Sequence, residues 1–148
     1  MSSPLYDGAC PMPAWRLSRH FLGRPASVTE ARRFITTTLG TWPVIESAEL
    51  IVSELATNAV RHTASARFGG KFTVSIQAEP DQVWLGVVDE GGPEVPRLVR
   101  PSDDEGGRGL LLVANLADNW GVYGNHTGRT VWALLKVDPI AAAQAACR

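Results

Sequence analysis

An amphipathic helix between Val44 and about His62 is the feature that most limits how this chain can fold. Its apolar residues return every three or four positions and form one stripe, made of Val44, Ala48, Ile51, Val52, Leu55 and Ala59. A helix with a single apolar stripe has to bury that stripe against another layer of structure. The remaining segments must therefore supply that layer.

A second helix is predicted just before this one. Ser27-Val28-Thr29-Glu30 has the pattern of a capping box, in which a hydroxyl and a carboxylate satisfy free backbone amides, and it predicts a helix that starts at Ser27. Gly40 is well placed to end this helix as a left-handed residue. The apolar residues Val28, Ala31, Phe34 and Ile35 recur between them at helical spacing.

Strand signals occupy most of the remaining chain. The sequence predicts an edge strand, a hairpin, a short helix and a second hairpin, which correspond to residues 15–21, 72–88, 110–116 and 120–137. The order helix, helix, hairpin, loop, helix, hairpin predicts an α+β fold. We expect a two-layer α/β sandwich, with a mixed, mostly antiparallel sheet and helices on one face.

The length of 148 residues fits one domain. We expect a flexible N-terminal segment over 1–14, the domain over 15–137 and a tail over 138–148, which is either a frayed helix or disordered. Cys10 and Cys147 lie in the two end segments and are expected to be free thiols, although a bridge between the ends remains an alternative.

Charge and hydropathy argue against two classes of partner. The net charge is −1, so no global attraction draws the chain to nucleic acid or an acidic membrane. The longest apolar run, 110–117, is far shorter than the ~20 residues of a membrane-spanning helix, and the N-terminus has no secretion signal. We expect a cytoplasmic protein with no direct contact to nucleic acid or membrane.

Glu54 and Asn58 stand four residues apart beside the apolar stripe, so their side chains point the same way. Such a pair can offer one general base and one neutral oxygen ligand for Mg²⁺. The alternative is a surface glutamate on the helix beside a capping-type asparagine, because this spacing is common by chance.

Asp89 ends an apolar strand and is followed by Glu90-Gly91-Gly92-Pro93. A carboxylate in this place can accept a hydrogen bond from a ligand's amino group, and glycine lets backbone approach the ligand closely. The alternative is a turn residue that merely ends the strand.

A glycine-rich segment, Gly106-Gly107-Arg108-Gly109, directly precedes the helix predicted from Leu110. Amides of a glycine turn and of a helix N-terminus suit an anion such as phosphate. The spacing matches neither the Walker pattern nor the Rossmann pattern. The three histidines share no metal-ligand spacing with the cysteines, so zinc is not expected.

Four motifs in this order resemble a known family. They are Glu54-Leu55-Ala56-Thr57-Asn58, Val88-Asp89-Glu90-Gly91, Gly107-Arg108-Gly109-Leu110 and Gly128-Arg129-Thr130-Val131. Over residues 27–137 the chain resembles the Bergerat-type ATPase domain shared by gyrase, heat-shock chaperones, histidine kinases and mismatch-repair proteins. Within this superfamily, residues 52–62 are most similar to the anti-sigma factor serine kinases, especially the stand-alone, single-domain type of actinobacteria.

The resemblance implies a role for each motif residue. Asn58 would hold the Mg²⁺ that bridges the ATP phosphates, and Glu54 would be the catalytic base. Asp89 would accept from the adenine amine, supported by Thr130, and Gly91 would let the purine lie close to backbone.

The same resemblance implies that the amides from Gly107 through Arg108 and Gly109 to Leu110 cradle phosphate, under a mobile lid over 93–106. The family often has glycine where this chain has Pro93, which changes the local geometry of the lid.

The resemblance further implies an ATP-dependent serine/threonine kinase. It would phosphorylate an anti-sigma antagonist, sequester a sigma factor, regulate transcription and act as a homodimer. The alternative is a non-catalytic nucleotide-binding module that sequesters a partner, although a retained Glu54 argues against it. A sensor histidine kinase would need an upstream dimerising helix with a phosphoacceptor histidine, for which the sequence has no signal.

Overall fold

The computed structural model describes residues 14–62, 69–91 and 105–146. In chain order the elements are β1 (Trp15–Leu22), α1 (Ala26–Leu39), α2 (Ile45–His62), β2 (Lys71–Glu79), β3 (Gln82–Asp89), α3 (Glu105–Leu116), β4 (Asn119–Asn125), β5 (Gly128–Lys136) and α4 (Pro139–Ala146).

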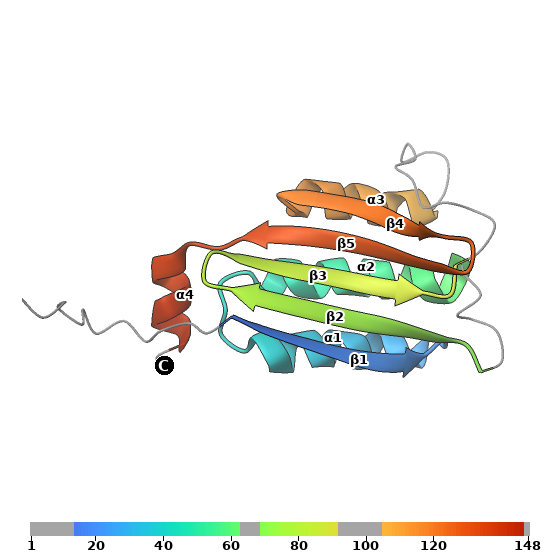
Figure 1. Ribbon diagram of the computed structural model, residues 1–148, viewed down its shortest axis with the longest axis horizontal. Coiled ribbons are helices and arrows are strands. Elements are labelled where there is room, and N and C mark those ends of the chain that lie inside the picture. Colours follow the sequence, from blue (N-terminus) through green and yellow to red (C-terminus); the bar gives the residue numbers. More distant parts are fainter. Residues whose placement is uncertain (1–13, 63–68, 92–104, 147–148) are drawn as a thin grey trace, which may run out of the picture.

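The five strands form one sheet in the order β1-β2-β3-β5-β4 (Figure 1). The strands β2 and β3 form the first predicted hairpin, β4 and β5 form the second, and β1 lies at the edge as expected. The two hairpins are joined by an antiparallel pairing of β3 with β5. All four pairings between the described strands are antiparallel, so the sheet is not mixed.

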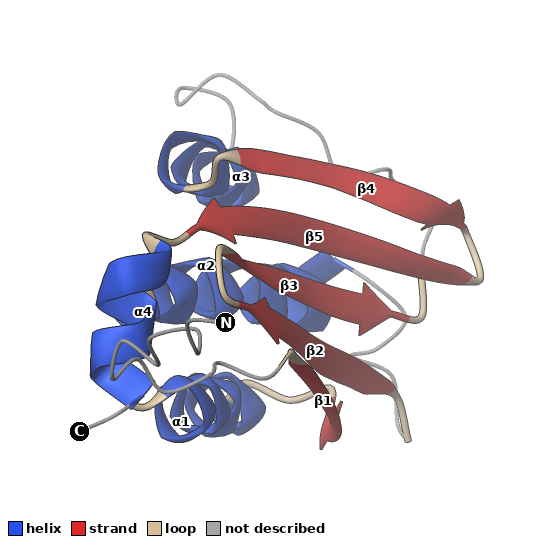
Figure 2. Ribbon diagram, turned by 60° about the vertical axis from the view of Figure 1, so that its left-hand side comes forward, coloured by secondary structure: helices blue, strands red, loops and turns tan. Residues whose placement is uncertain are grey.

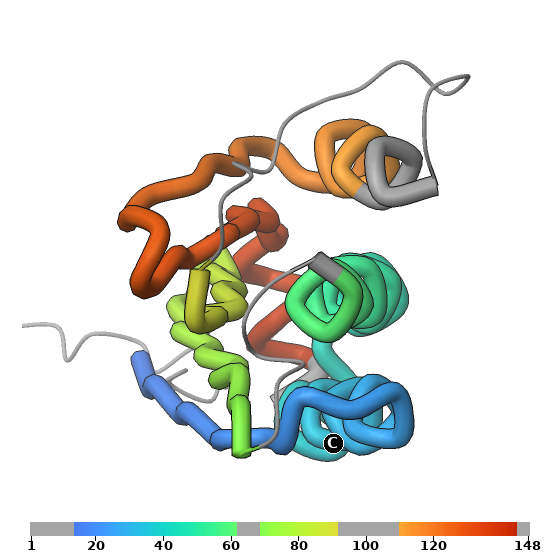
Figure 3. The backbone as a smooth tube through the Cα atoms, turned by 90° about the vertical axis from the view of Figure 1, so that its right-hand side faces the viewer, coloured from blue at the N-terminus to red at the C-terminus, as the bar shows by residue number. Residues whose placement is uncertain are grey.

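The helices α1, α2 and α3 cover one face of the sheet (Figure 2). None of the described helices lies on the other face, as the end view in Figure 3 also shows. The predicted α+β sandwich with helices on one face is therefore confirmed. The tail beyond the last strand contains α4, whose Ala142 is buried in the core.

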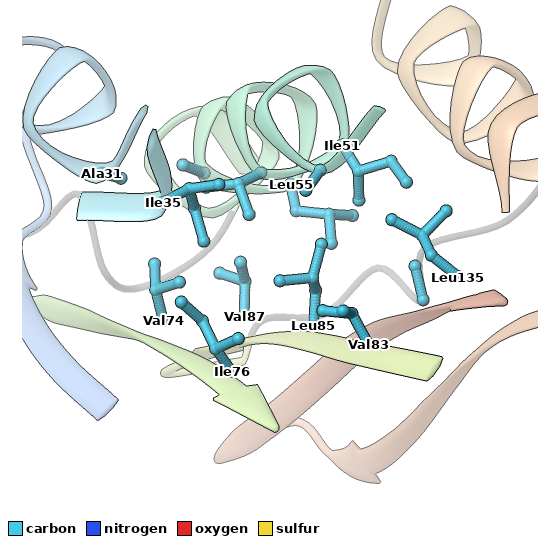
Figure 4. Close-up of a cluster of buried hydrophobic side chains, with 14 of the residues drawn as sticks. Ala31, Ile35, Ile51, Leu55, Val74, Ile76, Val83, Leu85, Val87 and Leu135 are labelled. Carbon is cyan, nitrogen blue, oxygen red and sulfur yellow. The ribbon is translucent and has the colours of Figure 1, made fainter. Parts of the chain in front are cut away.

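The core lies between α2 and the sheet (Figure 4). The predicted stripe of α2 provides one wall of it, because Ala48, Ile51, Val52, Leu55 and Ala59 are all buried. Alternate strand residues provide the other wall, namely Val74 and Ile76 of β2, Val83, Leu85 and Val87 of β3, and Val131, Ala133 and Leu135 of β5. The apolar stripe of α2 and the inward-facing residues of the strands thus pack together in one apolar layer.

The predicted capping box of α1 is wrong. The helix starts at Ala26, after Pro25 in helical conformation, and has no side-chain cap. Ser27 therefore lies inside the first turn, where its hydroxyl is buried without a hydrogen-bond partner. Gly40 does end the helix, with a φ of +57° and an amide that donates to the carbonyl of Thr36.

The described helices include no segment that combines the length and apolar character needed to cross a membrane.

Candidate functional site

Asp89 is the last residue of β3 and continues the inward side of that strand. Val83, Leu85 and Val87 of β3 point toward α2 in Figure 4. Asp89 is the next residue in this alternation, so its side chain lies on the same face of the strand. Asp89 is only 6% exposed, and its Oδ1 accepts a hydrogen bond of 2.6 Å from the amide of Gly91. The strand therefore places a buried carboxylate at the edge of the apolar core.

Burial raises the pKa of Asp89 above its ordinary value. The Gly91 amide and the positive charge of Arg129 act in the opposite direction, while the negative charge of Glu90 adds to the rise. The ionised carboxylate is therefore less favourable in the folded protein than in water.

A pH-dependent stability follows for Asp89→Asn. The neutral carboxyl stabilises the fold fully below the ordinary aspartate pKa of about 4, and that contribution is lost as the pH rises through the higher folded pKa. Asparagine cannot ionise, so the variant should unfold at a higher temperature than the wild type at pH 7 and lose this advantage near pH 4.

Thermal unfolding between pH 4 and pH 8 measures this difference. The exposed Asp81 at the other end of the hairpin supplies a control, and Asp81→Asn should show no such gain. A lower melting temperature of Asp89→Asn at pH 7 would contradict the prediction.

Arg129 lies directly opposite Asp89 in the antiparallel pairing of β5 with β3. It precedes the buried Val131, Ala133 and Leu135 at alternate positions, so it faces the same side of the sheet as Asp89. Arg129 is 3% exposed, and its Nε and Nη1 are buried without a hydrogen-bond partner. The site thus pairs a buried carboxylate with an unsatisfied guanidinium, a residue to which the sequence interpretation gave no role.

Thr130 lies on the opposite side of the sheet from Asp89. It is opposite Val88 on β3 and Tyr123 on β4, which are 37% and 56% exposed. Thr130 itself is buried. Strand alternation therefore brings Arg129, rather than Thr130, to the side of Asp89.

Gly91 is packed against the turn between β4 and β5. Its φ is +75°, and a Cβ at this position would overlap the backbone carbonyl of His126. Glycine is required here both by the backbone conformation and by the close approach of another segment.

Alanine substitution separates these two requirements. Gly69 has a φ of +78° but open space around its Cβ position. We expect Gly69→Ala to lower the free energy of unfolding by about 1–2 kcal/mol through backbone strain alone. The added overlap should make Gly91→Ala worse by about a further 1–3 kcal/mol. Equal losses in denaturant titrations would show that the packing of Gly91 does not matter.

Glu54 and Asn58 are half-buried on α2, on the side away from α1. The α1 side is marked by Glu49, whose Oε1 forms an ion pair of 3.0 Å with Arg32. Asn58 follows Glu49 by nine residues, about two and a half helical turns, and therefore lies on the opposite side. The helix α2 also contacts α3, which begins on that side of the molecule.

The C-terminal half of α2 ends at the same end of the molecule as β3 (Figure 1). The strand β5 and the helix α3 both begin at this end, which faces the viewer in Figure 3. The fold therefore gathers the predicted motif segments at one end of the sandwich. Glu54 and Asn58 come from the helical layer, and Asp89 and Arg129 come from the sheet.

The glycine-rich segment does not precede its helix as predicted. The helix α3 begins at Glu105, so Gly107, Arg108 and Gly109 lie within its first turns, and the buried Leu110 packs into the core. Glycine accepts helical angles as well as turn angles, and the first four amides of a helix have no partner within it. The side chain of Arg108 lies outside the described part.

Several predicted features lie outside the described residues. They include most of the proposed lid, over 93–104, as well as both cysteines and the side chain of His62. Among the described residues, no group of three or more histidine, cysteine or acidic side chains is arranged to hold a metal ion.

Comparison with known proteins identifies the fold. Residues 21–135 match the histidine kinase-like ATPase domain. The chain is 33% identical over 103 residues to the serine-protein kinase RsbW of Bacillus subtilis, covering 62% of this chain and 64% of that relative. It is 32% identical to RsbW of Bacillus velezensis with the same coverage. Because the match extends over most of the sheet and its helices, the chain belongs to the histidine kinase-like ATPase domain family.

Proposed function

We propose that this chain is a Mg·ATP-dependent serine/threonine kinase that controls a sigma factor. The observation that carries the proposal is that a buried Asp89 lies opposite Arg129, two of whose buried nitrogens lack a partner, at the end of the sheet. The C-terminal half of α2, which contains Glu54 and Asn58, ends at the same end of the molecule (Figure 1). These groups occur in a chain of the histidine kinase-like ATPase family, and its relatives include serine-protein kinases.

The described residues fit a purine nucleotide in three ways. Arg129 has two buried nitrogens that lack a partner, and a buried donor without a partner is costly unless a ligand completes it. Asp89, opposite Arg129 on the neighbouring strand, offers a carboxylate that can accept a hydrogen bond from the amino group of the base. Gly107 lies in the first turn of α3, where free backbone amides favour a phosphate group, and Gly109 follows in the next turn.

Mg²⁺ fits the site through oxygen donors. Asn58 would hold the ion through its amide oxygen, and Mg²⁺ in nucleotide sites takes most of its other ligands from phosphates and water. The ion would neutralise charge on the phosphates during transfer.

The protein's own residues divide the remaining work. Asp89 accepts from the adenine amine, and Gly91 keeps the backbone compact beneath the base. Thr130 supports β5 from the opposite face of the sheet. Glu54 accepts the proton of the attacking hydroxyl. The amides of Gly107 and Arg108, which belong to the first four of α3 and have no partner within the helix, hold phosphate.

The substrate of this reaction is proposed to be a serine or threonine of an anti-sigma antagonist. In the same proposal the chain acts in the cytoplasm as a homodimer that sequesters the sigma factor. Relatives named serine-protein kinases support the choice of acceptor, and the chain spans 64% of their length. A module that sequesters its partner without phosphorylating it is the rival, and it would leave the bound partner unmodified.

Calorimetric titration with ATP, with and without Mg²⁺, tests the nucleotide site. We expect Asn58→Ala to weaken Mg·ATP binding about tenfold or more, because the variant lacks a side chain that would bind the ion directly. Even residues that only hydrogen-bond to a metal ligand change metal affinity about 10–100-fold when they are replaced. The affinity measured with excess EDTA should be unchanged. Asn115→Ala provides the control, since Asn115 is an exposed asparagine near the far end of α3. Absence of ATP binding by the wild type would overturn the proposed function.

A further inference from the structure

The guanidinium of Arg129 is buried opposite Asp89, and part of its hydrogen-bonding capacity is unused. Its Nε and Nη1 are buried without a hydrogen-bond partner in the described part of the chain, and the residue as a whole is 3% exposed. A buried charged group without partners is among the least favourable arrangements in a protein interior. Of the described side chains, Ser27 is the other one with a buried, unpartnered polar atom, and it lies far along the chain in α1.

The position of Arg129 indicates what completes it. Arg129 and Asp89 are register partners on adjacent antiparallel strands, where opposite side chains on one face lie next to each other. The Asp89 carboxylate accepts hydrogen bonds, whereas a guanidinium only donates them. The two residues together therefore complement a ligand edge that carries a donor next to an acceptor.

The edges of adenine have this pattern. The exocyclic amine is a donor, and the ring nitrogens on either side of it, N1 and N7, are acceptors. We propose that Arg129 is a base-recognition residue, whose guanidinium donates to the adenine ring nitrogen adjacent to the amine that Asp89 accepts. This inference rests on the proposed function, because it concerns the same nucleotide.

The assignment differs from the one that the sequence suggested. Thr130 lies on the other side of the sheet and is opposite Val88, while Arg129 is opposite Asp89. A guanidinium also adds direct, charge-assisted donors, which form stronger hydrogen bonds than neutral groups do. Recognition of the base would therefore depend on a charged donor and a charged acceptor that come from neighbouring strands.

Deaza analogues of ATP test the proposed hydrogen bond. In 1-deaza-ATP and 7-deaza-ATP a ring nitrogen is replaced by carbon, which removes one acceptor. We expect the wild type to bind one of these analogues about tenfold more weakly than ATP, since hydrogen bonds to charged groups are the stronger ones. In Arg129→Met, ATP binding should weaken by a similar factor, and the difference between ATP and that analogue should disappear.

Controls separate recognition from a structural role. Arg16→Met replaces an exposed arginine on the edge strand β1 and should keep both affinities. Methionine has a similar length and no charge, so Arg129→Met should melt at the same temperature as the wild type or higher. If Arg129 only supports the fold, Arg129→Met will melt lower while the analogue difference persists, and the inference is then wrong.

A second variant covers the case in which Arg129→Met does not fold. Arg129→Lys retains a cation but lacks the planar donors of arginine, so the analogue difference should shrink in it as well. A wild type that binds ATP and both analogues equally well would overturn this inference alone. A wild type that binds no ATP would overturn the proposed function with it.

Discussion

Replacing Glu54 by glutamine should abolish phosphoryl transfer while ATP still binds. Glutamine has the shape of glutamate but cannot take up a proton, and general bases contribute about 10²–10⁴-fold to such reactions. Glu54 lies one helical turn before Asn58, on the side of α2 that faces away from α1. The expected result is a loss of at least about 100-fold in transfer rate, with ATP affinity near the wild-type value.

Single-turnover kinetics with labelled ATP measure this rate, and calorimetry measures binding. Glu46→Gln is the matched control, because Glu46 is an exposed glutamate in the first turn of the same helix. It should leave both quantities unchanged. A Glu54→Gln variant with full activity would show that another group takes the proton.

Replacing Asp89 by asparagine should weaken ATP binding about tenfold or more. The carboxylate only accepts hydrogen bonds, whereas an amide can turn a donor toward the adenine amine and leave both donors unpaired. The loss of affinity should accompany the gain in stability at neutral pH, as expected of a residue retained for binding.

Titration with ATP and GTP checks this assignment. The wild type should prefer ATP, and Asp81→Asn, in the exposed turn of the hairpin, should behave like the wild type. Equal affinity for the two nucleotides, or an unchanged ATP affinity in Asp89→Asn, would contradict the adenine assignment.

Periodicity in the sequence was sufficient to predict most of the fold. The stripe from Ala48 to Ala59 is buried as expected, and both hairpins occur where alternating apolar residues indicated them. These signals are robust because each depends on many residues that bury one face. The predicted start of α1 depended on only two side chains, those of Ser27 and Glu30. Pro25 in helical conformation places the helix start one residue before Ser27, which turns the hydroxyl into the interior.

The candidate site was harder to predict, because its geometry depends on strand register. Asp89 and Arg129 are forty residues apart in sequence, and only the pairing of β3 with β5 makes them neighbours. Alternation along β5 could have predicted which way Arg129 faces, since Arg129 lies on the same face of the strand as Val131 and Ala133. The register that brings Arg129 to Asp89, and leaves Thr130 on the opposite face, is a tertiary property.

The most direct test of the kinase proposal is transfer of phosphate to a bound partner. The chain is incubated with Mg²⁺, γ-labelled ATP and an antagonist protein whose tight binding has first been verified. The proposal predicts slow hydrolysis by the chain alone and labelling of one serine or threonine of the antagonist. It also predicts no labelling by Glu54→Gln at equal nucleotide occupancy. A tightly bound antagonist that stays unlabelled with the wild type would contradict the proposal and favour a sequestering module.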